Sequence, residues 1–215
     1  MEEMAAIAAR RGWCLRVGLE ILTARGLLWH GRVWDGGAEH PAWIVTDGSR
    51  RNAQARRLDG KPWEGIGGAK AKTLCKGGWP VGLEEARPFP HIMLCEGSAD
   101  FAAALFVAWW HGCVADVAPV GIMGASNGIP AEAAPCLSGK RVTIARHADT
   151  NGNAGQDAAQ RWADFARAAG AAAVDVLDFA QHAGLDGKPC KDLADLAQTL
   201  HMPEPEEMEA SPDGK

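Results

Sequence analysis

The spacing of apolar and polar positions changes near residue 90, and the part of the chain after that point has the clearer pattern. Short apolar runs alternate there with amphipathic segments of helical length, which is typical of a parallel sheet with helical crossovers. The predicted strands are 91–95, 117–123, 141–145 and 172–179. We therefore expect an α/β fold for this part of the chain.

Helices are expected after the first and third of these strands, and a last helix after the fourth. The first is predicted to have Ser98 as its N-cap and to bury Phe101, Leu105, Ala108 and Trp109. The second is predicted to bury Trp162, Phe165, Ala166 and Ala169. The last helix is expected to end near residue 200, before a tail rich in Pro and Glu that we expect to be disordered.

The first 90 residues favour a smaller α+β unit. The expected elements are helices 2–11 and 16–25, strands 27–34, 42–46 and 52–58, and a short helix 82–87. Turn residues separate the strands, and the tight turn Asp47-Gly48-Ser49 predicts an antiparallel hairpin of strands 42–46 and 52–58. The chain is thus divided into an amino-terminal α+β basic subdomain (1–90), an α/β domain (91–200) and an acidic tail (201–215).

The composition is ordinary for a globular protein. Of the 215 residues, 47% are apolar and 23% are charged. No apolar run approaches the ~20 residues of a transmembrane helix, and the first residues lack the basic segment of a signal peptide. The six cysteines are spread singly, which indicates neither a zinc ribbon nor a disulfide framework. We expect a cytoplasmic protein with no membrane partner.

Positive charge is concentrated in residues 50–76, although the net charge of the whole chain is −5. Eight Lys and Arg residues stand in this segment against two acids, with Trp63 and Trp79 nearby. Grooves for single-stranded nucleic acid combine cations with aromatic rings in this way. A solvated edge with buried tryptophans has the same composition, and composition alone favours that interpretation slightly. Arg56 and Arg57 are expected to point to opposite faces of their strand.

Acidic residues follow two of the predicted parallel strands. The first strand runs into Glu96-Gly-Ser-Ala-Asp100, and the third runs into His147-Ala-Asp149-Thr-Asn-Gly. The carboxyl ends of parallel strands lie at one edge of the sheet, so these side chains are expected to meet. Oxygen ligands of this kind suit Mg²⁺. Asp149 is the strongest metal candidate because its loop contains no other acid, whereas Asp100 can equally be an acid favoured by the start of its helix.

These two loops, in this order, resemble the TOPRIM domain of bacterial-type primases, topoisomerases and some nucleases. The family pairs Glu-Gly-x-x-Asp with Asp-x-Asp-x-x-Gly, and the first motif is complete here, whereas His147 stands at the first aspartate of the second. Lys191-Asp192 is similar to a Lys-Asp pair near the end of primase TOPRIM domains. The resemblance implies a Rossmann-like parallel four-stranded sheet flanked by helices.

The amino-terminal part is similar to the region that precedes TOPRIM in primases of phages, plasmids and other mobile elements. The similar segments are Lys72-Thr-Leu and Gly82-Leu-Glu-Glu-Ala-Arg87. With the TOPRIM motifs, the resemblance extends over roughly residues 15–200. The resemblance includes neither the zinc module nor the helicase part of those primases, so we expect a separately encoded replicative helicase as a partner.

The resemblance implies metal-dependent nucleotidyl transfer, that is RNA primer synthesis from nucleoside triphosphates on single-stranded DNA. The implied roles are catalysis for Glu96, Asp149 and Lys72, binding of Mg²⁺ or Mn²⁺ for Glu96, His147 and Asp149, and nucleic-acid binding for Arg56, Arg57, Lys70 and Lys72. Further candidates are Asp100, Lys191 and Asp192. Lys72 can instead be a surface lysine, and the Lys191-Asp192 pair can simply cap the last helix.

Two other functions fit the same residues. A TOPRIM nuclease would use the same carboxylates to activate water, and a DNA-binding replication accessory would need no metal. The histidine at position 147 replaces a hard oxygen ligand by an imidazole, which suits Mn²⁺ or Zn²⁺ better than Mg²⁺. With an unperturbed ring, metal binding is expected to weaken below roughly pH 6.5 as the imidazole protonates.

Overall fold

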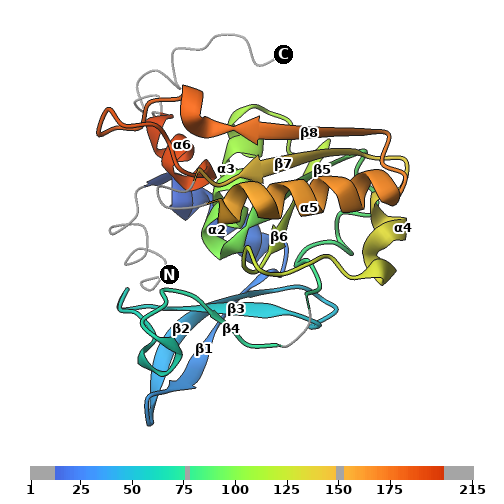
Figure 1. Cartoon of the computed structure of the whole chain (residues 1–215). Helices are drawn as coiled ribbons and strands as arrows, with labels where there is room; N and C mark the ends of the chain where they lie inside the picture. The colour runs from blue at the N-terminus through green and yellow to red at the C-terminus, as the bar shows by residue number, and fades with distance from the viewer. Residues whose placement is uncertain (1–12, 76–77, 149–152, 201–215) are drawn as a thin grey trace.

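The computed structural model describes residues 13–75, 78–148 and 153–200. These residues form a mixed α/β structure with two four-stranded sheets (Figure 1). The helix expected over residues 2–11 and the tail beyond residue 200 lie outside the described residues. None of the helices within the described ranges is long and apolar enough to span a membrane.

The parallel sheet carries the second part of the chain. Its strands are β5 (His91–Glu96), β6 (Val117–Ile122), β7 (Arg141–Arg146) and β8 (Ala173–Asp178). Their order is β6-β5-β7-β8 and all three pairings are parallel. The helices around it are α3 (Gly97–Trp110), α4 (Ala134–Leu137), α5 (Ala154–Ala168) and α6 (Leu193–Thr199). This parallel sheet flanked by helices confirms the expected α/β class and is consistent with a Rossmann-like fold.

The antiparallel sheet carries the first part. It contains β1 (Leu28–Asp35), β2 (Ala38–Thr46), β3 (Ala53–Arg57) and β4 (Lys72–Thr73) in sequential order. The helix α2 (Trp13–Ala24) precedes it, and short 3₁₀ turns lie at Glu64–Ile66, Ala131–Ala133 and Phe179–Gln181. The expected antiparallel hairpin is confirmed as β2–β3, with β2 starting four residues earlier than predicted, and β1 also pairs antiparallel with β2.

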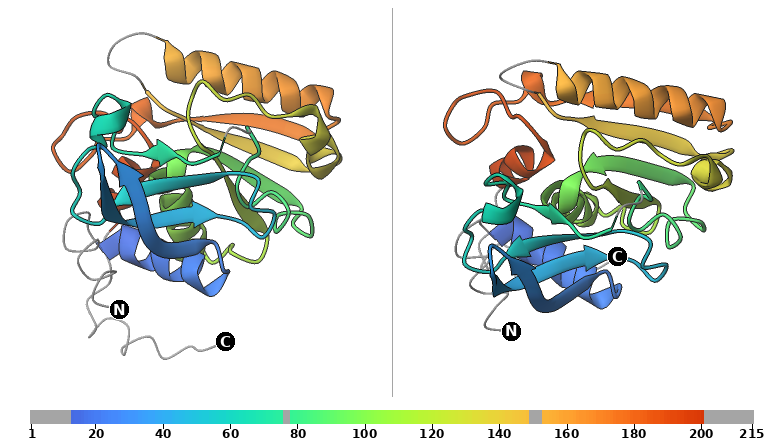
Figure 2. Two further views of the ribbon diagram at one scale, coloured as in Figure 1. Left: turned by 90° about the horizontal axis from the view of Figure 1, so that it is seen from below. Right: turned by 60° about the horizontal axis from the view of Figure 1, so that its bottom comes forward.

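Two apolar clusters lie on opposite faces of the parallel sheet. One joins α2, α3 and α6 to the antiparallel sheet through residues such as Leu19, Trp43 and Phe101. The other lies under α5 and includes Trp162 and Leu83. The right-hand view of Figure 2 shows the same order of layers, with α3 between the two sheets and α5 on the far side. The antiparallel sheet is therefore held against the parallel sheet by a shared core.

Helices α2 and α3 approach closely at Gly18. A Cβ atom at this position would lie 2.0 Å from the carbonyl oxygen of Ala102. Only glycine permits this contact, because any larger residue would force the two helices apart. The contact brings the amino-terminal helix onto α3, whose first turn forms part of the site described below.

Three local predictions are wrong. Residues 82–87 form hydrogen-bonded turns rather than a helix, with Ala86 N bonded to the Gly82 carbonyl. Ser98 is not the N-cap: α3 begins at Gly97 after Glu96, and Ser98 is fully buried. Trp109 is 42% exposed, although it was predicted to be buried. The prediction failed because α3 is apolar around most of its surface, so its periodicity does not single out one buried face.

Candidate functional site

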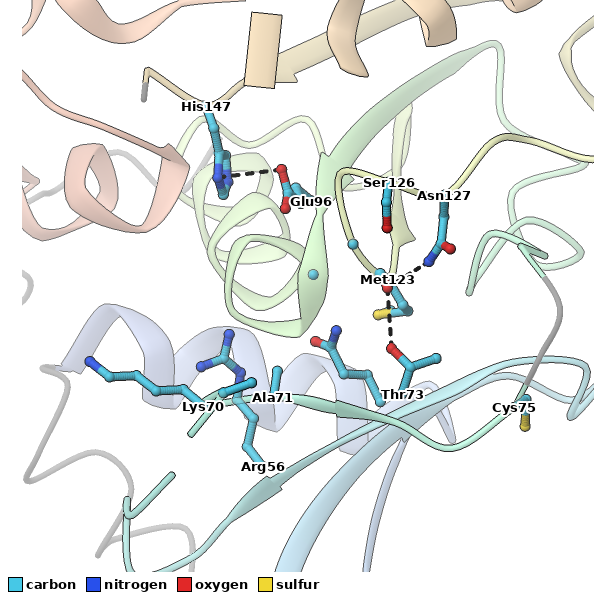
Figure 3. Close-up of a pocket in the computed structure, with 14 residues that line it drawn as sticks. Arg56, Lys70, Ala71, Thr73, Cys75, Glu96, Met123, Ser126, Asn127 and His147 are labelled. Atoms are coloured by element: carbon cyan, nitrogen blue, oxygen red, sulfur yellow. Dashed lines mark hydrogen bonds and ion pairs between the residues drawn. The ribbon is translucent and has the colours of Figure 1, made fainter. Parts of the chain in front are cut away.

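A pocket of about 690 Å³ lies where the carboxyl ends of β5 and β7 face the antiparallel sheet. Its lining includes Glu96 at the end of β5, Gly97 at the start of α3, His147 after β7, and the loop that follows β6. The opposite wall comes from β3, β4 and the segment before β4. Figure 3 shows Glu96 and His147 on one side of this pocket, with Arg56 and Lys70 on the other. The expected meeting of the two loops is thus observed for Glu96 and His147.

Glu96 is held at both carboxylate oxygens. Its Oε1 accepts a hydrogen bond of 3.0 Å from the backbone N–H of Ala125, in the loop after β6. Its Oε2 lies 3.5 Å from His147 Nδ1. The side chain is about one-fifth exposed and lines the pocket, so it is positioned by the fold and accessible to a ligand.

His147 connects Glu96 to the buried Asp100. Its Nε2 donates to Asp100 Oδ2, and Asp100 is only 2% exposed. The other Asp100 oxygen accepts from the Ala194 N–H at the start of α6, at 3.2 Å. The prediction left Asp100 open between a structural and a functional role; the structure makes it the partner of the histidine at the bottom of the site.

The environment of His147 changes its acid–base behaviour. Burial lowers its pKa, but the hydrogen bond to Asp100 and the charges of Asp100, Glu96 and Asp192 outweigh burial and raise the pKa to about 9. Burial also raises the pKa of Asp100, against the effect of the hydrogen bond from His147. The expectation of a neutral imidazole near neutral pH is therefore wrong for the metal-free protein, because the carboxylates around the ring favour its charged form.

Asp100, His147 and Asp192 can hold a metal ion. Each offers one ligand atom, and these atoms lie within 4.8 Å of one another. Asp192 is also the N-cap of α6, since its Oδ1 accepts from the Asp195 N–H at 2.8 Å. Two carboxylates and an imidazole fit a divalent ion that accepts both nitrogen and oxygen ligands. The capping role considered for Asp192 is confirmed, and the residue also belongs to this group of possible metal ligands.

Arg56 and Lys70 supply positive charge to the facing wall of the pocket. Arg56 Nε donates to the hydroxyl of Ser98 at 2.9 Å, which ties β3 to the first turn of α3. Lys70 is exposed and precedes β4. Two of the four predicted nucleic-acid-binding residues thus lie at the pocket.

Arg57 and Lys72 lie on the other face of the antiparallel sheet. Lys72 Nζ is 2.8 Å from Oδ1 of the buried Asp35, and Arg57 is paired with Asp59 at 2.5 Å. Thr73, the neighbour of Lys72 on β4, lines the pocket instead. The prediction that Arg56 and Arg57 face opposite sides is confirmed. Lys72 is not brought to Glu96.

Other sequence candidates are not brought into the pocket. Lys191 contributes backbone contacts: its carbonyl accepts from the Ala148 N–H at 2.7 Å, and its N–H donates to Asp195 Oδ2 at 3.1 Å. Its side chain lines a separate surface hollow next to α6. Asp149, the strongest metal candidate in the sequence, lies outside the described residues, so its role as a ligand stays a prediction.

The two tryptophans near the basic segment are core residues. Trp63 is fully buried and Trp79 is 3% exposed. Their rings carry the protein's own cations, with Arg57 5.9 Å above Trp63 and Arg51 3.7 Å above Trp79. They cannot stack on nucleobases in this state, so the interpretation as buried tryptophans is confirmed for both.

Gln54 is a polar pocket residue that the sequence analysis did not single out. Gln54 lies two positions before Arg56 on β3 and is 5% exposed. Strand alternation places the two side chains on the same face, so the choice of Arg56 could have pointed to Gln54 as well.

Comparisons of the chain with protein-family models, curated proteins and solved structures find no match.

Proposed function

We propose that the pocket is a TOPRIM-type site for metal-assisted nucleotidyl transfer, and that the protein synthesises primers on single-stranded DNA. One observation carries the proposal. A cluster of acids and a histidine lies at the carboxyl edge of the parallel sheet, and Arg56 and Lys70 face it across the pocket. Such a site can bind a metal ion on one wall and phosphate groups on the other.

The metal would be held by His147, Asp100 and Asp192, next to Glu96. A bound divalent ion would supply charge that stabilises the phosphate oxygens during transfer. The imidazole favours Mn²⁺ over Mg²⁺ in this ligand set. Metal binding requires His147 to lose its ring proton, so affinity for the ion is expected to rise with pH up to about pH 9.

Glu96 and Arg56 have the other proposed roles at this site. Glu96 is kept in place by the Ala125 N–H. We assign it the role of accepting a proton from an attacking hydroxyl, and its position at the pocket, with Oε2 beside His147, supports this role. Arg56 is fixed through Ser98 and would bind phosphate oxygens of the nucleotide or the template.

Glu96→Gln is the sharpest test of this function. The amide oxygen of glutamine can still accept the hydrogen bond from Ala125, so the variant should fold normally and lose activity. The measurement is primer synthesis on single-stranded DNA with Mn²⁺ or Mg²⁺. The matched control is Glu132→Gln, because Glu132 is an exposed acid in the 3₁₀ turn Ala131–Ala133 and does not line the pocket.

The same samples distinguish the alternative functions. Wild-type activity in Glu96→Gln would contradict the proposed role of this residue. Cleavage of labelled DNA with metal but without nucleotides would identify a nuclease instead. DNA binding without either activity would identify a replication accessory.

A further inference from the structure

Gln54 is a buried polar side chain that reaches the pocket without a role in the site described so far. It is 5% exposed and lines the pocket together with Arg56 and Gly97. Across the antiparallel sheet it is paired with Thr73, which lines the same wall. A buried amide in such a position needs partners for both its oxygen and its nitrogen.

The oxygen of this amide has its partner. The Ser98 N–H, in the first turn of the 14-residue helix α3, donates to Gln54 Oε1 at 2.9 Å. This bond fixes the orientation of the amide, because turning it over would bring two donors together. The nitrogen Nε2 is then the free end, and the described part of the chain provides no acceptor for it.

The surroundings determine which acceptor fits Nε2. The helix start carries partial positive charge, and the amide bonded to it passes that polarisation on to its own N–H groups. Arg56 and Lys70 line the same wall and add two full positive charges. The acceptor favoured here is therefore an anion. Gln54 lies with Arg56 and Lys70 on the wall of the pocket that faces Glu96.

We infer that Gln54 is a ligand-binding residue whose Nε2 donates to a phosphate oxygen in the pocket, beside Arg56. The inference rests on the proposed function only in taking this pocket as the reaction site. The phosphate group belongs to a nucleoside triphosphate or to the backbone of a single strand, which share this chemistry.

Gln54→Glu separates the ligand contact from the structural one. A carboxylate still accepts from the Ser98 N–H, and a negative charge at a helix start is favourable, so the fold is retained. The donor is replaced by a negative acceptor, which repels phosphate. Gln54→Leu removes both contacts. Gln160→Glu, on the exposed side of α5, makes the same charge change away from the pocket.

Calorimetry on the full chain would measure binding of inorganic triphosphate, ATP and a short single-stranded oligonucleotide. We expect Gln54→Glu to weaken binding at least about tenfold while Gln160→Glu binds as wild type does, since loss of a hydrogen bond to a charged group is worth about that factor. A loss for triphosphate and ATP alone identifies the nucleotide; a loss for the oligonucleotide alone identifies the strand.

Wild-type affinity in Gln54→Glu for all three probes would overturn the inference, as would the absence of binding by the wild-type protein. Circular dichroism and urea unfolding establish whether each variant is folded. The result is independent of primer synthesis: phosphate binding that depends on Gln54 in a protein without polymerase activity would leave this inference standing and overturn the proposed function.

Discussion

The charged state of His147 makes a quantitative prediction about stability. Its pKa in the folded, metal-free protein is about 9, against 6.5 for an unperturbed histidine. Since the pKa is higher in the folded protein, the protonated ring makes its full contribution to the free energy of unfolding below pH 6.5. This contribution is lost as the pH rises through 9. The perturbation that removes it is His147→Asn, because the amide side chain of asparagine does not titrate.

The size of the effect follows from the two pKa values. The rise from 6.5 to about 9 corresponds to about 3 kcal/mol, because each tenfold change in proton affinity is worth ~1.4 kcal/mol. The His147 side chain is 25% exposed, so solvent screens the interaction only in part. Burial raises the pKa of its partner Asp100, which opposes formation of the ion pair. About 3 kcal/mol is therefore an upper bound.

Urea unfolding in the presence of a chelator, at pH values from 6 to 10, measures this contribution. We expect the difference in unfolding free energy between wild type and His147→Asn to shrink by up to about 3 kcal/mol across that range. His182→Asn, at an exposed position, should follow the wild-type profile. A difference between wild type and His147→Asn that stays constant with pH would refute the assignment of a charged imidazole.

Three further substitutions test other parts of the structure. Arg56→Ala should weaken single-stranded DNA binding and reduce the salt slope by about 0.7 per lost phosphate contact, whereas Arg57→Ala, on the other face of β3, should leave the slope unchanged in the same titration. Lys72→Met should lower the melting temperature by leaving the buried Asp35 without its partner, while triphosphate binding measured by calorimetry stays at the wild-type level. Gly18→Ala should destabilise the fold by about 1–3 kcal/mol in urea unfolding, because its methyl group meets a carbonyl of α3.

The parallel sheet was predictable because its signals are local and repeated. Each strand is a short apolar run followed by a polar loop, and the alternation with helices fixes the class of fold. The same periodicity failed for Trp109, since α3 is packed on several sides and almost every position in it is apolar. Residues 82–87 have a helix-like composition but form turns. Their start is fixed by the bond from the Gly82 N–H to Asp47 and by the bridge of the preceding Val81 to Gly121 of β6, which no local pattern encodes.

The site was predicted in part, and the difference lies in contacts between distant segments. Glu96 ends β5 and His147 follows β7, and these two strands pair directly, so the meeting of the two residues follows from topology. The position of Lys72 depends on the register between β3 and β4, and a change of one residue there exchanges the two faces of the strand. Motif spacing carries no information about that register, which is why it did not show that Thr73 rather than Lys72 lines the pocket.

The histidine at position 147 also explains how the acidic cluster can be stable without a metal. Glu96, Asp100 and Asp192 surround one point at the sheet edge, and three carboxylates alone would repel one another. An imidazolium bonded to Asp100 neutralises one of these charges from within the fold. With aspartate in its place, a fourth negative charge would have to be balanced by a bound cation. The histidine thus supplies positive charge to this cluster from within the fold, and a metal ion would have to compete with its proton to bind there.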